Sequence, residues 1–163
     1  MTNNDILRRI RYIFDFNDTK MIAIFDRVEE AVTRERISDW LKKDDDPAYK
    51  SLSDTQLAIF LNGLIVEKRG KKEGPLPVPE KTLNNNIVFR KLKIALDLKN
   101  EDVLDILSLA NLKISKHELS AFFRRQDHKH YRVCKDQILR NFLNGLQLKY
   151  RPDVKPGSEF SWT

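Results

Sequence analysis

Basic and histidine side chains crowd one stretch in the second half of the chain. The stretch contains Lys113, Lys116, His117, Arg124, Arg125, His128, Lys129, His130, Arg132 and Lys135. Lysine and arginine neutralise phosphate groups, so positive charge concentrated beside a helix favours nucleic acid as the ligand. The side chains expected to contact phosphate are Arg124, Arg125, Lys129 and Arg132, with Lys116 and His117 close by. The simpler alternative is a solvated basic face that only keeps the protein soluble.

Nitrogen and sulfur ligands for a metal ion occur in the same stretch. Three candidates fall within seven residues, at His128, His130 and Cys134, and His117 precedes them. The chain also contains an internal repeat that pairs each residue with the one 82 positions later. The four residues opposite these candidates are Glu35, Asp46, Ala48 and Leu52. The shared fold therefore does not require a metal, and leucine opposite Cys134 indicates a small buried thiol. Neither a metal site nor a cofactor is predicted.

Other catalytic or metal-binding patterns are missing from the sequence. The acidic run at residues 44–46 lacks the spaced oxygen ligands and the glycine of a calcium loop, and a solvated loop before Pro47 explains it better. No G-x-S-x-G sequence occurs, and the serines fall at predicted helix starts or in linkers. The sequence therefore predicts no catalytic residue and no enzyme.

The elements that must position these side chains are encoded as two copies of one unit. Residues 3–69 match residues 85–151 at a constant offset of 82 without a gap, and 16 of the 67 positions are identical. Unrelated sequences of this composition would share roughly four or five. The longest shared block is Phe-Leu-Asn-Gly-Leu, at residues 60–64 and 142–146. A period this long predicts two small domains rather than stacked solenoid repeats.

Apolar residues at helical spacing predict four helices in each copy. In the first copy these positions are Ile6, Leu7, Ile10, Ile13 and Phe14, then Met21, Ile22, Phe25 and Val28, then Ile37, Trp40 and Leu41, then Leu57, Phe60, Leu61 and Leu64. The second copy keeps apolar character at the same positions while many identities change. The predicted fold class is all-α, with two tandem copies of a small four-helix domain.

Local signals mark the later helices of the unit. Ser115 followed by Glu118, and Ser53 followed by Gln56, have the spacing of a capping box. Gly63 and its counterpart in the second copy lie in or at the end of the fourth helix, where glycine costs about 1 kcal/mol relative to alanine. Close helix packing or a C-terminal cap explains these glycines better than a ligand contact, because a single glycine lacks the pattern of a phosphate loop.

The remaining segments are a linker and a tail. Residues 70–84 contain glycines, charges and alternating prolines, which predict an extended, semi-rigid spacer between domains at residues 3–69 and 85–151. Residues 152–163 follow the second domain and contain two aromatic residues. This tail is expected to be either disordered or folded back over a domain.

Three parts of the sequence form a distinctive set. They are Asn-Asn-Asp-Ile-Leu-Arg-Arg-Ile-Arg-Tyr at residues 3–12, Trp-Leu-Lys-Lys at 40–43, and the two Phe-Leu-Asn-Gly-Leu blocks with Arg69 or Arg151 downstream. The set resembles the YehS-like proteins, a bacterial family defined by a domain of unknown function, whose members carry two copies of this unit. The resemblance covers residues 3 to about 151. It implies the duplicated fold, and it brings no activity, substrate or catalytic residue with it.

Charge divides unevenly between the two copies. The chain has a formal net charge of +6. Residues 3–69 hold 12 Lys and Arg against 13 Asp and Glu, whereas residues 85–151 hold 14 against 7. The excess of positive charge therefore belongs to the second copy, and the hypothesis of an anionic partner applies to that copy.

The composition is that of a globular chain without a disulfide framework. Hydrophobic residues make up 40% of the chain and charged residues 33%, and Cys134 is the single cysteine. No window approaches 18 apolar residues, and charges interrupt the first nine residues where a secretory signal needs an apolar stretch. We therefore expect a cytoplasmic protein with no membrane partner.

The second and third predicted helices of the first copy fit a helix-turn-helix poorly. The segment from Val28 to Thr33 is longer than the usual turn of about three or four residues, and it contains no glycine. In the second copy, Asp105 also replaces Ala23, where the motif needs a small packing residue. Ordinary helix packing is therefore preferred over a DNA-reading helix.

The favoured function is a non-enzymatic binding module whose basic second copy binds an anionic partner, nucleic acid first of all. The first copy would support assembly or contact another protein. The alternative is a protein-interaction or adaptor module in which the charge is incidental. A surface cluster of aromatic residues would favour this alternative, and its candidates are Trp40, Tyr49, Tyr131, Phe160 and Trp162. The sequence sets no oligomeric state.

Overall fold

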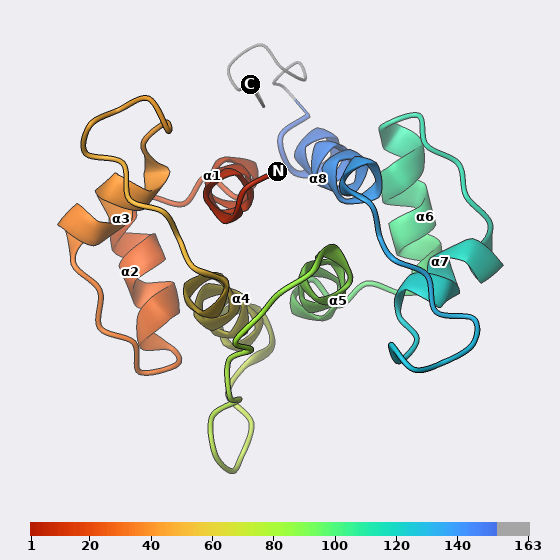
Figure 1. Ribbon diagram of the computed structural model, residues 1–163, viewed down its shortest axis with the longest axis horizontal. Coiled ribbons are helices and arrows are strands. Elements are labelled where there is room, and N and C mark those ends of the chain that lie inside the picture. Colours follow the sequence, from red (N-terminus) through yellow and green to blue (C-terminus); the bar gives the residue numbers. More distant parts are fainter. Residues whose placement is uncertain (153–163) are drawn as a thin grey trace. The chain divides into compact units, whose positions relative to one another are not determined.

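A computed structural model describes residues 1–152, and within them the chain forms eight α-helices and no β-strand (Figure 1). The helices are α1 (Asn3–Ile13), α2 (Asp18–Asp26), α3 (Arg34–Leu41), α4 (Asp54–Arg69), α5 (Asn85–Ala95), α6 (Asn100–Leu109), α7 (Lys116–Phe122) and α8 (Asp136–Tyr150). The chain divides into two compact units, with the boundary between Leu83 and Asn84. Each unit contains four helices, so the predicted tandem all-α fold is confirmed.

Polar side chains begin most of the helices. The two predicted capping boxes are confirmed: Ser53 pairs with Gln56 at the start of α4, and Ser115 pairs with Glu118 at the start of α7. A third box, which the sequence analysis missed, joins Thr2 and Asp5 at the start of α1. Each box satisfies backbone N–H groups that the first turn of a helix leaves without partners.

The core of each unit consists of the apolar residues at helical spacing. Of the residues predicted to lie inside the first unit, Leu7, Ile10, Phe25 and Phe60 are buried with at most 1% of their surface exposed. Ile24 and its counterpart Ile106 are also buried, although neither is among the predicted core positions. In each unit, the second helix packs against the third and the fourth.

The glycine of the Phe-Leu-Asn-Gly-Leu block permits one very close helix contact in each unit. A Cβ atom built on Gly63 would lie 2.2 Å from the carbonyl oxygen of Ile24, and one built on Gly145 would lie 2.1 Å from that of Ile106. Real side chains never come so close to backbone. The predicted role in close packing is therefore confirmed, since α4 contacts α2 and α8 contacts α6 at a point that leaves room for a hydrogen only.

Two turns in each unit use left-handed backbone. Asp15 and Asp97, which follow the first helix of their units, both have φ of 53°. Glu29 and Asn111, which follow the second helix, have φ of 61° and 62°. Aspartate and asparagine tolerate this region better than other non-glycine residues, and glutamate does so less well. These turns therefore have the same backbone conformation in both units. At the second turn, asparagine in the second unit tolerates this conformation better than glutamate in the first.

The predicted linker lies against the first unit over part of its length. Thr55 donates a side-chain hydrogen bond of 3.1 Å to the carbonyl oxygen of Glu80, and the backbone N–H of Leu83 donates one of 2.8 Å to the Asp54 carboxylate. Both contacts are made to the first turn of α4. The end of the predicted spacer, residues 70–84, is therefore hydrogen-bonded to the first unit, and the boundary between the two compact units lies between Leu83 and Asn84.

Two sequence predictions concern membranes and the tail. Among residues 1–152, no helix has both the length and the apolar character needed to cross a bilayer. The aromatic residues Phe160 and Trp162 lie outside the described residues.

Candidate anion-binding face

Helix α7 is held in place by three buried residues and a cap. Leu119, Ala121 and Phe122 are buried, and α7 packs against α6. Ser115 accepts a hydrogen bond of 3.0 Å from the backbone N–H of Glu118, which fixes the first turn. Because the buried residues occupy one side of this short helix, Lys116 and His117 at its start are exposed.

The loop from Phe123 to Lys135, which follows α7, is pinned from inside by Asn86. Its amide nitrogen donates hydrogen bonds of 3.0 Å to the carbonyl oxygen of Phe122 and of 2.7 Å to that of Arg132. Its amide oxygen accepts one of 2.9 Å from the backbone N–H of Cys134. Asn86 is only 4% exposed. One buried side chain therefore closes the loop at both ends.

A neighbouring asparagine extends this attachment to the next helix. The Asn85 amide donates to the Cys134 carbonyl oxygen at 3.0 Å and to the Asp136 carboxylate at 2.7 Å. Asp136 is the first residue of α8. The paired asparagines at the start of α5 thus tie together the end of α7, the loop and the start of α8.

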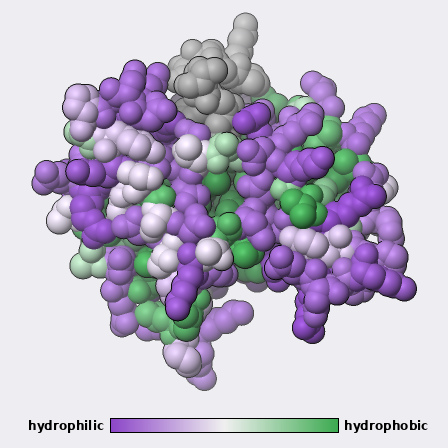
Figure 2. Space-filling view, viewed as in Figure 1, coloured by the Kyte–Doolittle hydropathy of each residue, from purple (hydrophilic) through white to green (hydrophobic). Residues whose placement is uncertain are grey.

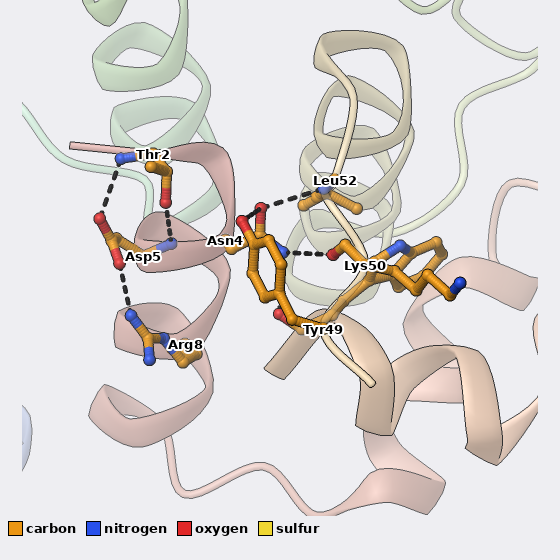
Figure 3. A network of polar contacts seen from close by, with 8 residues as sticks. Thr2, Asn4, Asp5, Arg8, Tyr49, Lys50 and Leu52 are labelled. Atoms are coloured by element: carbon orange, nitrogen blue, oxygen red, sulfur yellow. Dashed lines mark hydrogen bonds and ion pairs between the residues drawn. The ribbon is translucent and has the colours of Figure 1, made fainter. Parts of the chain in front are cut away.

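The first unit repeats this arrangement atom for atom, with one addition (Figure 3). The Asn4 amide donates to the carbonyl oxygens of Trp40 at 3.0 Å and Lys50 at 2.8 Å, and it accepts from the Leu52 N–H at 3.0 Å. The hydroxyl of Tyr49 also donates to the Asn4 amide oxygen, at 3.0 Å. We refer to Asn4 and Asn86 with their partners as the asparagine clamps.

The repeated Asn-Asn pair had no predicted role. The signal was available, because the pair stays identical at the start of two amphipathic helices in a repeat where most identities change. Buried polar groups are found where hydrogen bonds satisfy them, and both donors and the acceptor of each clamp amide are used. The clamps shape the loop, whereas the residues predicted to bind phosphate lie on its outside.

Five of the six predicted phosphate contacts are exposed, and a contact between the rings of His117 and His130 places the start of α7 beside the loop. Lys116 and His117 lie at the start of α7, and Arg125, Lys129 and Arg132 lie on the loop that follows it. We call these five, together with His128 and His130, the basic face. Mostly hydrophilic side chains lie on the surface around α7 and its loop (Figure 2), and Val133 on the loop is an exposed apolar residue among them.

Arg124, the sixth predicted contact, differs from the others. It is half-buried, and its Nε atom is buried without a hydrogen-bond partner among the described residues. Its guanidinium is therefore less available to a ligand than that of Arg125. Arg124 is the weakest of the six predicted contacts.

Two members of the basic face form ion pairs with nearby acids. Lys116 lies 3.1 Å from the Glu101 carboxylate, and Arg125 lies 3.3 Å from the Asp127 carboxylate. All four side chains are at least 60% exposed. Exposed pairs of this kind contribute little and are screened by salt, so a polyanion can displace the acid at small cost.

Three histidine rings meet on the basic face. The ring centroids of His117 and His130 lie 6.2 Å apart, and those of His128 and His130 lie 5.6 Å apart. The Nδ1 atom of His128 accepts a hydrogen bond of 3.0 Å from the backbone N–H of His130. The histidines lie close together in the sequence, and the start of α7 and the loop bring their rings into contact, with the planes inclined by 65° and 41°.

The fourth candidate metal ligand, Cys134, lies inside the unit. It is 1% exposed, and burial, followed by the nearby Asp136 carboxylate, raises the pKa of its thiol to about 12. The predicted buried thiol is therefore confirmed, and such a group is a poor metal ligand or nucleophile at neutral pH. Among residues 1–152, no group of three or more His, Cys, Asp or Glu residues is placed to hold a metal ion.

The corresponding loop of the first unit has a different outer surface. Asp44, Asp45 and Asp46 are exposed, and the Asp46 carboxylate accepts a hydrogen bond of 2.9 Å from the backbone N–H of Ala48. Residues 42–53 contain three basic and three acidic residues, whereas residues 124–135 contain five basic and one acidic. The predicted solvated acidic loop fits this arrangement, and the charge contrast between the units is concentrated in these loops.

The aromatic residues named for a protein interface are not gathered on the described surface. Trp40 is 4% exposed and packs against Phe25, with ring centroids 5.7 Å apart. Tyr49 and Tyr131 are half-buried beside their loops.

Comparison with known proteins identifies the family. A family model described as "Protein of unknown function (DUF1456)" matches the chain twice, over residues 3–70 and 85–151. The uncharacterized protein YehS of Escherichia coli (strain K12) is 45% identical over 158 residues, which cover 96% of this chain and 100% of that protein. No solved structure matches the chain. The chain therefore belongs to the DUF1456 family, and the resemblance to the YehS-like proteins is confirmed.

Proposed function

We propose that this protein is a non-enzymatic nucleic-acid-binding module that contacts phosphate groups through the basic face of its second unit. The proposal is carried by one observation: the two loops have the same backbone hydrogen bonds but differ in charge. The asparagine clamps hold both loops in the same way, yet the second loop carries five basic residues and one acidic residue where the first carries three of each.

The placement of the basic residues supports this function. Lys129 and Arg132 are exposed on a loop that Asn86 fixes from below, so their backbone needs little ordering when a ligand binds. Lys116 and Arg125 form ion pairs with exposed carboxylates, which a phosphate group can displace. Release of counterions from nucleic acid would then supply most of the binding free energy, independently of sequence.

A binding titration with matched charge reversals tests the proposal. The full chain is titrated into a fluorescent DNA duplex at several salt concentrations, and the logarithm of the affinity should fall linearly with the logarithm of the salt concentration. Arg125→Glu with Arg132→Glu should weaken binding by about tenfold or more and lower the salt slope by about one for each residue. The same changes at the corresponding positions of the first unit, Lys43→Glu with Lys50→Glu, are the control.

Each outcome of this titration is informative. Equal losses from the two double variants would assign the effect to net charge, and they would end the proposal for the basic face. Binding that does not depend on salt, or no binding to any nucleic acid, would also contradict it. Circular dichroism should show unchanged helix content in both variants, because all four residues are exposed.

A protein-interaction module is the second candidate, and one observation favours it. An open groove of about 290 Å³ on the first unit is lined by apolar side chains that include Val28, Ile59, Leu76 and Val78. Val78 is 87% exposed. Val78→Asp should abolish capture of a protein partner if this surface is the interface, and it should leave duplex binding unchanged. For either function we propose a cytoplasmic location, because a buried single thiol suits a reducing compartment.

A further inference from the structure

The histidine rings of the basic face add a feature that phosphate binding alone does not need. His117, His128 and His130 are all exposed, and they come from two separate segments. Their positions in the first unit are occupied by Glu35, Asp46 and Ala48. The second unit therefore carries three planar rings in the same region as its excess of positive charge.

The loop itself orients one of these rings. Because the His128 Nδ1 atom accepts the N–H of His130, the proton of the neutral ring is on Nε2. The ring therefore cannot turn freely about its Cβ without losing this hydrogen bond. An aromatic surface that is held in place before binding loses less entropy when a ligand stacks on it.

The rings are inclined to one another, so each one offers its own face to a ligand. The planes of His117 and His130 meet at 65°, and those of His128 and His130 meet at 41°. No group of three or more metal-binding side chains placed to hold a metal ion is found among the described residues. A base can stack on the face of one exposed ring without a second ring on its other side.

Unpaired bases are the ones that expose their flat faces. In a duplex the bases stack on each other and present only their edges, whereas in a single strand they can stack on His rings and on Arg guanidinium groups. We propose that the basic face recognises single-stranded nucleic acid, with bases on His117, His128 and His130 and phosphates on Lys129 and Arg132. This inference rests on the proposed function, since it names the form of nucleic acid that the same face binds.

A comparison of single strand and duplex tests the inference. Affinities of the full chain are measured by fluorescence anisotropy for one short mixed-sequence oligonucleotide and for the same oligonucleotide paired with its complement. We expect the single strand to bind about tenfold tighter, as one or two stacked bases would give. His128→Ala with His130→Ala should remove this preference, so that the single strand then binds about as tightly as the duplex does.

A conservative variant separates stacking from charge and hydrogen bonding. His128→Phe with His130→Phe keeps two flat rings and removes the imidazole nitrogens, so it should retain the preference for the single strand. Loss of the preference in the Phe variant as well as in the Ala variant would overturn the stacking role. Lys129→Ala with Arg132→Ala should weaken both ligands about equally.

The remaining outcomes distinguish this inference from the proposed function. Equal affinities for single strand and duplex would refute the inference and leave the proposed function standing. If neither ligand binds, both fail. Salt-sensitive self-association of the chain without nucleic acid, seen by light scattering and abolished by Asp44→Asn with Asp46→Asn, would instead assign the basic face to the acidic loop of a second copy, and this result would also overturn the inference.

Discussion

Residues 42–53 of the first unit and residues 124–135 of the second follow the same path with different outer surfaces. The backbone N–H of Tyr49 donates to the carbonyl oxygen of Asp46, and that of Tyr131 donates to His128, both at 3.0 Å. The asparagine clamps bind carbonyl oxygens and an N–H at equivalent positions. On the outside, the first loop carries three aspartates, whereas the second carries five lysine and arginine residues and two histidines.

The comparison shows which positions of the unit are constrained. Positions that make hydrogen bonds through the backbone tolerate many residue types, so Asp46 and His128 occupy the same site. The clamp needs the amide of asparagine, and the helix contact needs a residue without a Cβ atom. These positions therefore do not tolerate other residue types, and they are asparagine and glycine in both units. Different binding surfaces can therefore be placed on one loop without change to the fold.

The largest loss of stability is expected from alanine at Gly63 or Gly145. These two variants test whether the α2–α4 and α6–α8 contacts are equivalent. Gly63→Ala and Gly145→Ala each place a methyl group within 2.2 Å or less of a backbone oxygen, so the helices must separate. Each change should lower the free energy of unfolding of its own unit by about 3 kcal/mol. Urea unfolding followed by circular dichroism measures this, with the exposed Gln137→Ala as a control within about 0.5 kcal/mol. A loss below about 1 kcal/mol in one unit would show that the contacts differ.

The clamps should show the next largest effect. Asn4→Asp and Asn86→Asp keep the size of the side chain and the acceptor oxygen but remove both N–H donors. Two carbonyl oxygens then lose their partners and face a carboxyl group, so each unit should lose about 2–3 kcal/mol. Hydrogen exchange should show loss of protection at Leu52 or Cys134, whose N–H groups the clamps bind. Unchanged protection would mean that the loops hold their shape without the clamps.

The smallest effect would sharpen the one difference between the clamps. Tyr49→Phe removes a hydroxyl that donates to Asn4, and it should cost the first unit about 1 kcal/mol. Tyr131→Phe is the matched change in the second unit, where Asn86 is bonded to backbone groups alone among the contacts described above, and it should be nearly neutral. Thermal unfolding measures both variants. Equal losses would show that the two tyrosines have the same role.

The fold could be predicted from the sequence because each helix of the unit occurs twice, and the two copies could be compared. Apolar positions that persist while identities change, such as Trp40 and Phe122, indicated buried faces, and the capping pairs Ser53–Gln56 and Ser115–Glu118 indicated helix starts. The candidate face was predicted in part. Charge placed it on α7 and its loop, whereas the burial of Arg124 depends on packing that no spacing rule describes.

The clamps were missed because their partners are backbone groups. The sequence records that Asn4 is repeated as Asn86, but the groups that they bind belong to residues of many types, such as Trp40 and Phe122 or Leu52 and Cys134. A pattern search that pairs side chains cannot find such contacts. Only the path of the loop shows that one amide reaches positions 36 and 48 residues further along the chain.

The sequence separation between each clamp asparagine and its partners has a consequence for folding during synthesis on the ribosome. The first residues of each unit remain without their partners until Leu52, or in the second unit Cys134, has left the exit tunnel, so the unit cannot close while it is being made. The segment that holds Leu83 to Asp54 emerges before α5 does. The first unit can therefore be complete before the second begins to fold, and we expect this order to limit the exchange of matching helices between the two units.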